Sequence, residues 1–138
     1  MSAPLHVAAG PRALRHLSEH GLQLTDIRAL LGASGGPKWL MLNQLDRVMA
    51  PKLAADARVD LDLLGTSIGS WRFACYAQPD PLAAINRFEE AYFEQRYSAS
   101  PDADEVSRVC RQILQAILLD NRDTIASSPH RRLHILAN

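Results

Sequence analysis

The sequence has no Asp-Gly dipeptide, no long apolar run, no excess of charge of either sign and only two cysteines. Fifteen basic and fifteen acidic residues give a formal net charge of zero, which does not indicate nucleic acid or a strongly anionic partner. Residues 1–17 lack the apolar stretch of a secretory signal, and no segment reads as a transmembrane span. We therefore expect a cytoplasmic protein, and any lipid contact would have to come from apolar surface.

The cysteines and histidines do not predict a disulfide or a metal site. Cys75 and Cys110 fall among apolar residues of predicted helices, and we expect two buried thiols. His6, His16 and His20 come closest to a metal site, because the last two lie four residues apart on one predicted helix face. No third ligand is evident near that pair. We expect surface or capping histidines and no cofactor.

The stretch over residues 59–76 carries the clearest chemical signal. Residues 59–64 predict a short buried strand, and residues 71–76 can continue as a helix. Between them, Gly-Thr-Ser-Ile-Gly at residues 65–69 fits the Gly-x-Ser-x-Gly pattern of a nucleophile elbow. Ser67 would project its hydroxyl from a tight turn where Gly65 and Gly69 avoid collisions by lacking Cβ. The alternative is a βα turn that uses these residues for geometry and for an N-cap.

A second glycine cluster follows another predicted strand, residues 26–31. A helix is predicted after it, ended by Pro51, with apolar side chains at helical spacing: Met41, Leu42, Leu45, Val48 and Met49. The loop over residues 32–39 therefore feeds a helix N-terminus, where free N–H groups and the helix dipole favour anions. In acyl transfer that anion is the tetrahedral oxyanion. Both glycine loops follow strands of a predicted parallel sheet, so they should lie at one edge of it.

These two motifs together resemble the patatin-like phospholipase family, in particular a bacterial branch of it. The string Gly-Gly-Pro-Lys at residues 35–38 matches the family's oxyanion loop, and residues 65–69 match its elbow. The resemblance implies an α/β fold, a three-layer sandwich with a mainly parallel sheet, and lipid or carboxylic-ester hydrolysis by a Ser-Asp dyad. Ser34 and Trp39 stand where the family usually has glycine, and we expect this bulkier pair to narrow the approach of substrate to the loop.

The resemblance also implies roles for individual residues. Ser67 would be the nucleophile, and the backbone N–H groups of Gly35 and Gly36 would form the oxyanion hole, helped by that of Ile68. Lys38 would orient the loop or meet anionic head groups. The partners implied are a lipid or ester substrate and a transient contact with a membrane surface.

The family's catalytic aspartate, which comes from an Asp-Gly motif, has no match here. Asp80 reads as a helix N-cap, and Asp102 and Asp104 lie in the first turn of another predicted helix. Asp120 and Asp123 lie in the polar segment that follows that helix. We therefore expect residues 1–138 to be the truncated N-terminal part of a single patatin-like acyl hydrolase domain, with weak or no activity in isolation.

Two other functions stay open at this point. An α/β-hydrolase with a Ser-Asp-His triad would also need a serine elbow and an oxyanion loop. A non-catalytic remnant that acts as a binding module would lack the acid altogether. A phosphate-binding Walker loop is disfavoured, because Trp39 stands where that motif needs Ser or Thr.

The rest of the chain predicts further helices and strands. A helix over residues 11–20 should place Leu14 and Leu17 inward and end at Gly21, after a short edge strand over residues 5–9. Helices are predicted over residues 81–97 and 102–119, and a strand over residues 131–138. The expected inward residues of the two helices are Leu82, Ile85, Phe88, Tyr92, Val106, Val109, Cys110, Ile113, Leu114, Ile117 and Leu118.

Overall fold

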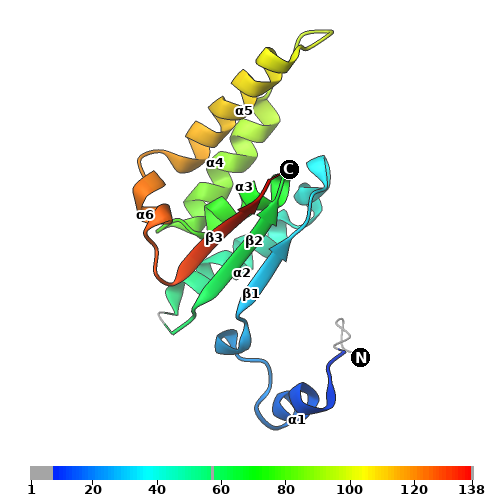
Figure 1. Ribbon diagram of the computed structural model, residues 1–138, viewed down its shortest axis with the longest axis vertical. Coiled ribbons are helices and arrows are strands. Elements are labelled where there is room, and N and C mark those ends of the chain that lie inside the picture. The colour runs from blue at the N-terminus through cyan, green and yellow to red at the C-terminus, as the bar shows by residue number, and fades with distance from the viewer. Residues whose placement is uncertain (1–7, 57, 138) are drawn as a thin grey trace.

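The computed structural model describes residues 8–56 and 58–137, which form a parallel sheet with helices packed on one face and a first helix that lies apart from it (Figure 1). Its elements are, in order, α1 (Pro11–His20), the 3-10 helix η1 (Leu24–Asp26), β1 (Ala29–Gly32), the 3-10 helix η2 (Gly36–Met41), α2 (Asn43–Ala55), β2 (Leu61–Thr66), α3 (Ile68–Tyr76), α4 (Pro81–Glu94), α5 (Ala103–Leu118), α6 (Arg122–Ala126) and β3 (Arg131–Leu136).

The three strands lie in the order β1-β2-β3 and all run parallel. Gly32 of β1 is level with Gly65 of β2, so the two glycine motifs leave the sheet at the same edge. Both crossovers step in the same direction across the sheet. Because parallel crossovers share one hand, their helices belong on the same face.

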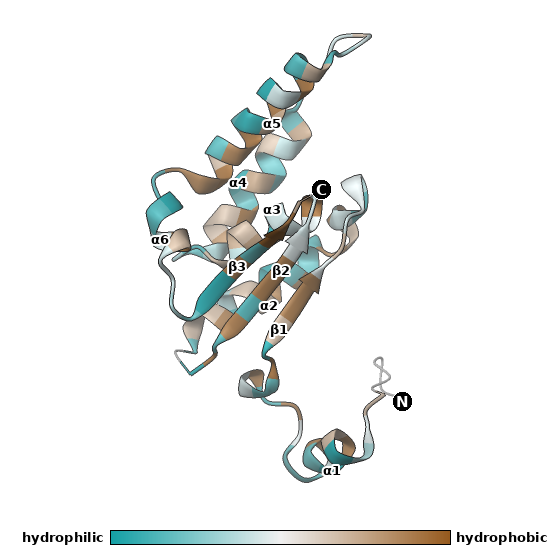
Figure 2. Ribbon diagram, in the orientation of Figure 1, coloured by the Kyte–Doolittle hydropathy of each residue, from teal (hydrophilic) through white to brown (hydrophobic). Residues whose placement is uncertain are grey.

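A mixed α/β fold with a parallel sheet is therefore confirmed, but the described residues form two layers and not the expected three. On the uncovered face Leu31 is 80% exposed, and His134 is also exposed. Figure 2 shows the hydropathy along the strands, which is mainly apolar in β1 and polar at the start of β3.

Glycines let α3 approach the sheet closely at the edge where the two motifs meet. A Cβ on Gly69 would lie 2.1 Å from the carbonyl oxygen of Gly32, and a Cβ on Gly65 would lie 2.5 Å from the Cα of Ser70. Neither contact leaves room for a larger residue, because the opposing atoms are backbone. The first turn of α3 is thereby held against the ends of both β1 and β2.

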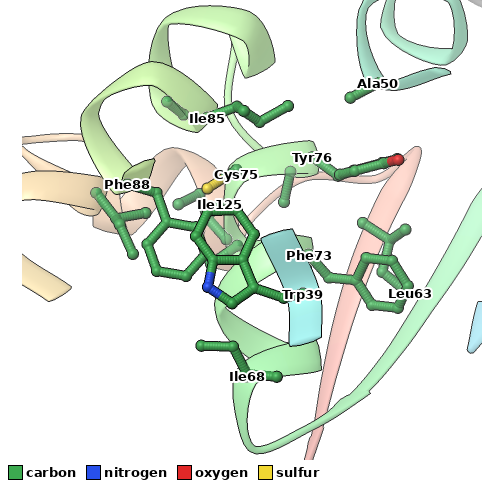
Figure 3. Close-up of a cluster of buried hydrophobic side chains, with 14 of the residues drawn as sticks. Trp39, Ala50, Leu63, Ile68, Phe73, Cys75, Tyr76, Ile85, Phe88 and Ile125 are labelled. Atoms are coloured by element: carbon green, nitrogen blue, oxygen red, sulfur yellow. The ribbon is translucent and has the colours of Figure 1, made fainter. Parts of the chain in front are cut away.

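The core fills the space between the sheet and the helices (Figure 3). Leu61 and Leu63 of β2 are buried beneath α3, and Phe88 of α4 stacks on Trp39 of η2 with ring centroids 4.2 Å apart. Trp39 is 3% exposed, so it anchors the glycine loop in the core. The expectation that Trp39 narrows the approach of substrate is not met, since its ring is buried against Phe88 and Tyr92.

Helix α2 turns a different face inward from the one that the sequence predicted. Met41 and Leu42, just before it, and Leu45 and Val48 within it are exposed, and Met49 is half-buried. The buried positions are instead Asn43, Asp46, Ala50 and Leu53. Pro51 does not end the helix, which continues to Ala55. The physical reason for the rotation is that Asp46 has buried partners on α3, described below.

The ends of the chain also differ from expectation. Helix α1 forms where predicted and ends at Gly21, whose φ of +69° allows its N–H to bond the Leu17 carbonyl. It contributes no buried residue, however, so the inward placement of Leu14 and Leu17 is wrong. The predicted edge strand over residues 5–9 lies mostly outside the described residues, and Ala8 and Ala9 are not in a strand.

Several element boundaries shift by a few residues. Strand β1 starts only at Ala29, because Asp26 instead accepts a hydrogen bond from the Gln23 N–H and holds η1. Strand β2 likewise starts and ends later than predicted. Helices α4 and α5 bury Ile85, Phe88, Val109, Ile113 and Ile117 as expected, while Tyr92, Cys110 and Leu118 are half-buried and Leu82, Val106 and Leu114 are exposed.

The backbone contact between Gly32 and Gly69 predicts the effect of adding one methyl group. We expect Gly69→Ala to lower the free energy of unfolding by about 3 kcal/mol, because a backbone carbonyl cannot rotate away from the new Cβ. Gly10→Ala is the matched control, since a Cβ there would meet nothing within 4 Å. Urea unfolding followed by circular dichroism measures both. Equal midpoints for the two variants would contradict the contact.

Candidate active site

Ser67 lies at the junction of β2 and α3 in a backbone conformation that is rare for residues with a side chain. Its φ is 51° and its ψ is −127°. Ser67 is exposed, although the next two residues, Ile68 and Gly69, are buried. Its hydroxyl makes no capping hydrogen bond to α3, so the alternative of a serine kept only as an N-cap is not supported. A strained, projecting serine between two glycines is the geometry of a nucleophile elbow.

The backbone conformation alone does not identify a nucleophile. Leu119 has φ 46° and ψ −129°, where it ends α5. What distinguishes Ser67 is its surroundings: glycines on both sides that admit close backbone packing, the N-terminus of α3 immediately after it, and a groove beside it.

The glycine loop lies at the same edge of the sheet. It follows β1 directly, and η2 contacts α3. Gly36 has φ +51°, and the carbonyl of Gly35 accepts a hydrogen bond of 3.2 Å from the N–H of Lys38, which closes the turn. Among the described residues the N–H groups of Gly35 and Gly36 have no protein acceptor, so both are free to bind an anion.

A groove of about 420 Å³ opens beside Ser67. Its polar lining residues are Thr66, Ser67 and Ser70. Its apolar lining comes from α3, α5 and the end of β3: Trp71, Ala74, Leu114, Ile135, Leu136 and Ala137. A second hollow of about 410 Å³ shares Ala74, Leu114 and Ile135 with this one and continues it toward α6. We call the first hollow the Ser67 groove; its lining suits an apolar group joined to the serine.

A buried ion pair ties the helix after the glycine loop to the helix after the serine. Asp46 of α2 accepts hydrogen bonds of 2.7 and 2.6 Å from the Arg72 guanidinium and one of 2.9 Å from the Tyr76 hydroxyl. Burial opposes the charge of Arg72, but the hydrogen bonds and charge of Asp46 hold the pKa of the guanidinium above its ordinary value. Burial and the nearby Asp46 charge raise the pKa of Tyr76. This cluster fixes α2 against α3.

An imidazole–carboxylate pair on the open sheet face, His134 with Asp62, does not serve Ser67. His134 Nε2 lies 2.9 Å from Asp62, which also accepts from Arg132 at 2.8 Å. His134 is paired in register with Leu64, about 10 Å of strand before Ser67. Since Asp62 lies farther from Ser67 than Leu64 does, the ring that contacts Asp62 points away from the serine. Sequence reasoning missed this pair because its members are 72 residues apart.

The other residues singled out from the sequence lie at the surface or at helix ends. Lys38 is exposed at the loop, and Ser34 is exposed beside it. Asp80 caps α4 through the Ala83 N–H, as predicted. Asp104 lies in the first turn of α5, as predicted, whereas Asp102 is the N-cap of that helix and accepts a hydrogen bond from the Glu105 N–H. Short helix α6, which the sequence analysis did not predict, follows Asn121.

Within residues 8–56 and 58–137 no cluster of three metal-ligating side chains occurs, and no helix is long and apolar enough to cross a membrane. His16 contacts Asp26 at 3.0 Å, and His20 is exposed, while His6 lies outside the described residues. Cys75 is fully buried, which raises the pKa of its thiol, and Cys110 is half-buried.

The buried Asp46 cluster predicts a large loss of stability when its charge is removed. Asp46→Asn leaves the Arg72 guanidinium without its buried counter-ion, and we expect the free energy of unfolding to fall by about 3 kcal/mol. Asp104→Asn is the control, because Asp104 is exposed in the first turn of α5. Urea unfolding of both variants should show a marked loss for the first and little change for the second. The reverse order would contradict the assignment.

The Asp62 cluster predicts a contribution to stability that is lost in acid. Hydrogen bonds from Arg132 and His134 lower the pKa of Asp62 from 3.8 to about 2. Because the folded state favours the ionised carboxylate, this contribution is complete above pH 3.8 and is lost as the pH falls toward 2. The stability difference between the natural chain and Asp62→Asn should therefore shrink across that range, measured as urea midpoints. A difference independent of pH would contradict this; Asp104→Asn, at an exposed carboxylate, is the control.

Comparisons with known proteins found no matching family model, no matching curated protein and no matching solved structure.

Proposed function

We propose that Ser67 is the nucleophile of a serine acyl hydrolase of the patatin-like type, acting on lipid or other carboxylic esters. The observation that carries the proposal is the backbone of Ser67, which holds an uncapped, exposed hydroxyl in a strained conformation beside an apolar groove. Strain of this kind persists only where surrounding packing imposes it, here through Gly65 and Gly69.

The second support is the glycine loop. In the proposed reaction the Ser67 oxygen attacks the ester carbonyl, and the negative charge moves to the carbonyl oxygen. The free N–H groups of Gly35 and Gly36, with that of Ile68 at the start of α3, would stabilise this oxyanion. Donors fixed by packing need no reorganisation during the reaction, and Trp39 supplies that packing.

The third support is the composition of the Ser67 groove. Six of its lining residues are apolar, from Trp71 on α3 to Ala137 after β3, which suits the acyl part of an ester. None of its described lining residues is a carboxylate or an imidazole. The reaction therefore needs a base that these residues do not supply, and in the Ser-Asp form of the proposal that base is an aspartate. Lys38, exposed at the loop, would meet an anionic head group.

The absence of a base among the described residues of the Ser67 groove also favours a second candidate, a module that binds acyl groups without hydrolysing them. The same groove and the same free N–H groups would serve such a module. The two candidates differ in one measurable property, which is the reactivity of the Ser67 hydroxyl.

Reaction with a p-nitrophenyl alkylphosphonate tests this difference. The phosphorus atom forms a bond to an activated serine oxygen, p-nitrophenolate leaves, and the serine proton goes to the base or to solvent. We expect mass spectrometry of the full protein to locate the adduct on Ser67, and Ser67→Ala to lose both labelling and ester hydrolysis while keeping its circular dichroism spectrum.

Ser100→Ala is the matched control, because Ser100 lies exposed in the loop between α4 and α5. Labelling and turnover should be unchanged in it. Hydrolysis that survives in Ser67→Ala would overturn the nucleophile assignment, and a folded protein that binds esters but never labels would favour the binding module.

A further inference from the structure

Ser70 carries a buried hydroxyl for which the protein provides no partner. It lies on α3, three residues after Ser67, and is only 6% exposed. Its oxygen is one of three buried side-chain polar atoms in the described residues that have no hydrogen bond; the others are on Trp39 and Asn43. Of these three residues only Ser70 lines the Ser67 groove. Leaving a buried polar atom without a partner is costly, and such atoms commonly meet a ligand or water.

The position of Ser70 is fixed by backbone contacts. A Cβ on Gly65 would lie 2.5 Å from its Cα and 2.6 Å from its nitrogen, so Ser70 rests directly on strand β2. Its N–H donates a hydrogen bond of 2.9 Å to the carbonyl of Ser67. The backbone of Ser70 is therefore held at a set place relative to Ser67.

The order of residues along α3 places Ser70 early on the path of a bound acyl chain. Residues three or four apart lie on one face of a helix, so Ser67, Ser70 and Ala74 line the groove in succession. Ser70 is about 4.5 Å along the helix axis from Ser67, and Ala74 about 10.5 Å. A chain that is joined to Ser67 and runs along α3 reaches Ser70 before Ala74, and the groove residues other than Thr66, Ser67 and Ser70 are apolar.

We propose that Ser70 is a specificity-determining residue that selects acyl groups with a hydroxyl on the β-carbon, the first position clear of the reacting carbonyl and its neighbour. The substrate class is then an ester of a β-hydroxy acid. This inference rests on the proposed function of Ser67. The hydrogen bond from the substrate satisfies the buried oxygen of Ser70, whereas an unsubstituted chain leaves it unpaired in the groove.

A matched pair of phosphonates tests the selection. The p-nitrophenyl esters of propylphosphonate and of 2-hydroxypropylphosphonate place phosphorus where the carbonyl carbon would be, so the second carries its hydroxyl at the β position. The second-order rate of Ser67 labelling is measured for both probes in the full protein. We expect the hydroxylated probe to react about tenfold faster, the effect of one hydrogen bond.

Two variants distinguish a role of the Ser70 hydroxyl in selecting substrate from a role of Ser70 in packing alone. Ser70→Ala should bring the ratio of the two rates close to one, and Ser70→Thr, which keeps a hydroxyl, should retain the preference. A purely structural serine would change both rates together and leave their ratio unaltered.

The outcomes also separate this inference from the proposed function. Labelling of Ser67 at equal rates by the two probes, or a preference that persists in Ser70→Ala, overturns the role of Ser70 while the nucleophile stands. Failure of both probes to label Ser67 overturns the nucleophile and the inference together.

Discussion

The candidate site depends on one backbone contact, the meeting of Gly32 at the end of β1 with Gly69 in the first turn of α3. No side chain fits between them, since a Cβ on Gly69 would lie 2.1 Å from the Gly32 carbonyl oxygen. This contact joins the strand that leads into the glycine loop to the helix that follows the serine. The loop and Ser67 therefore meet at one edge of the sheet through close backbone packing.

The buried ion pair of Asp46 and Arg72 is a second constraint on the site. The Asp46 carboxylate, buried against Arg72 and Tyr76, joins α2 to α3. Because α2 follows the glycine loop and α3 follows the serine, the ion pair fixes the position of the loop relative to Ser67. This arrangement rotates α2 about its own axis, because the buried carboxylate of Asp46 needs partners on α3. The apolar side chains of Leu45 and Val48 are therefore exposed to solvent.

The local backbone of the candidate site was predictable from the sequence, whereas its tertiary surroundings were not. Glycines around Ser67 and Pro37 after a glycine pair constrain the backbone within a few residues, so the turns after β1 and β2 lie where the sequence predicts them. The inward face of α2 was predicted wrongly because hydrophobic spacing carries no information about the partners of Asp46, which are 26 and 30 residues away. The unpartnered hydroxyl of Ser70 likewise emerges only from packing.

The central claim is that the glycine loop and Ser67 act on the same reacting group. The crystal structure of the protein after reaction with an alkylphosphonate tests it most directly, because the phosphonyl oxygen occupies the place of the oxyanion. We predict that this oxygen lies within about 3 Å of the backbone nitrogen of Gly35 or Gly36. An adduct on Ser67 whose oxygen is turned to solvent, away from both nitrogens, would contradict the account.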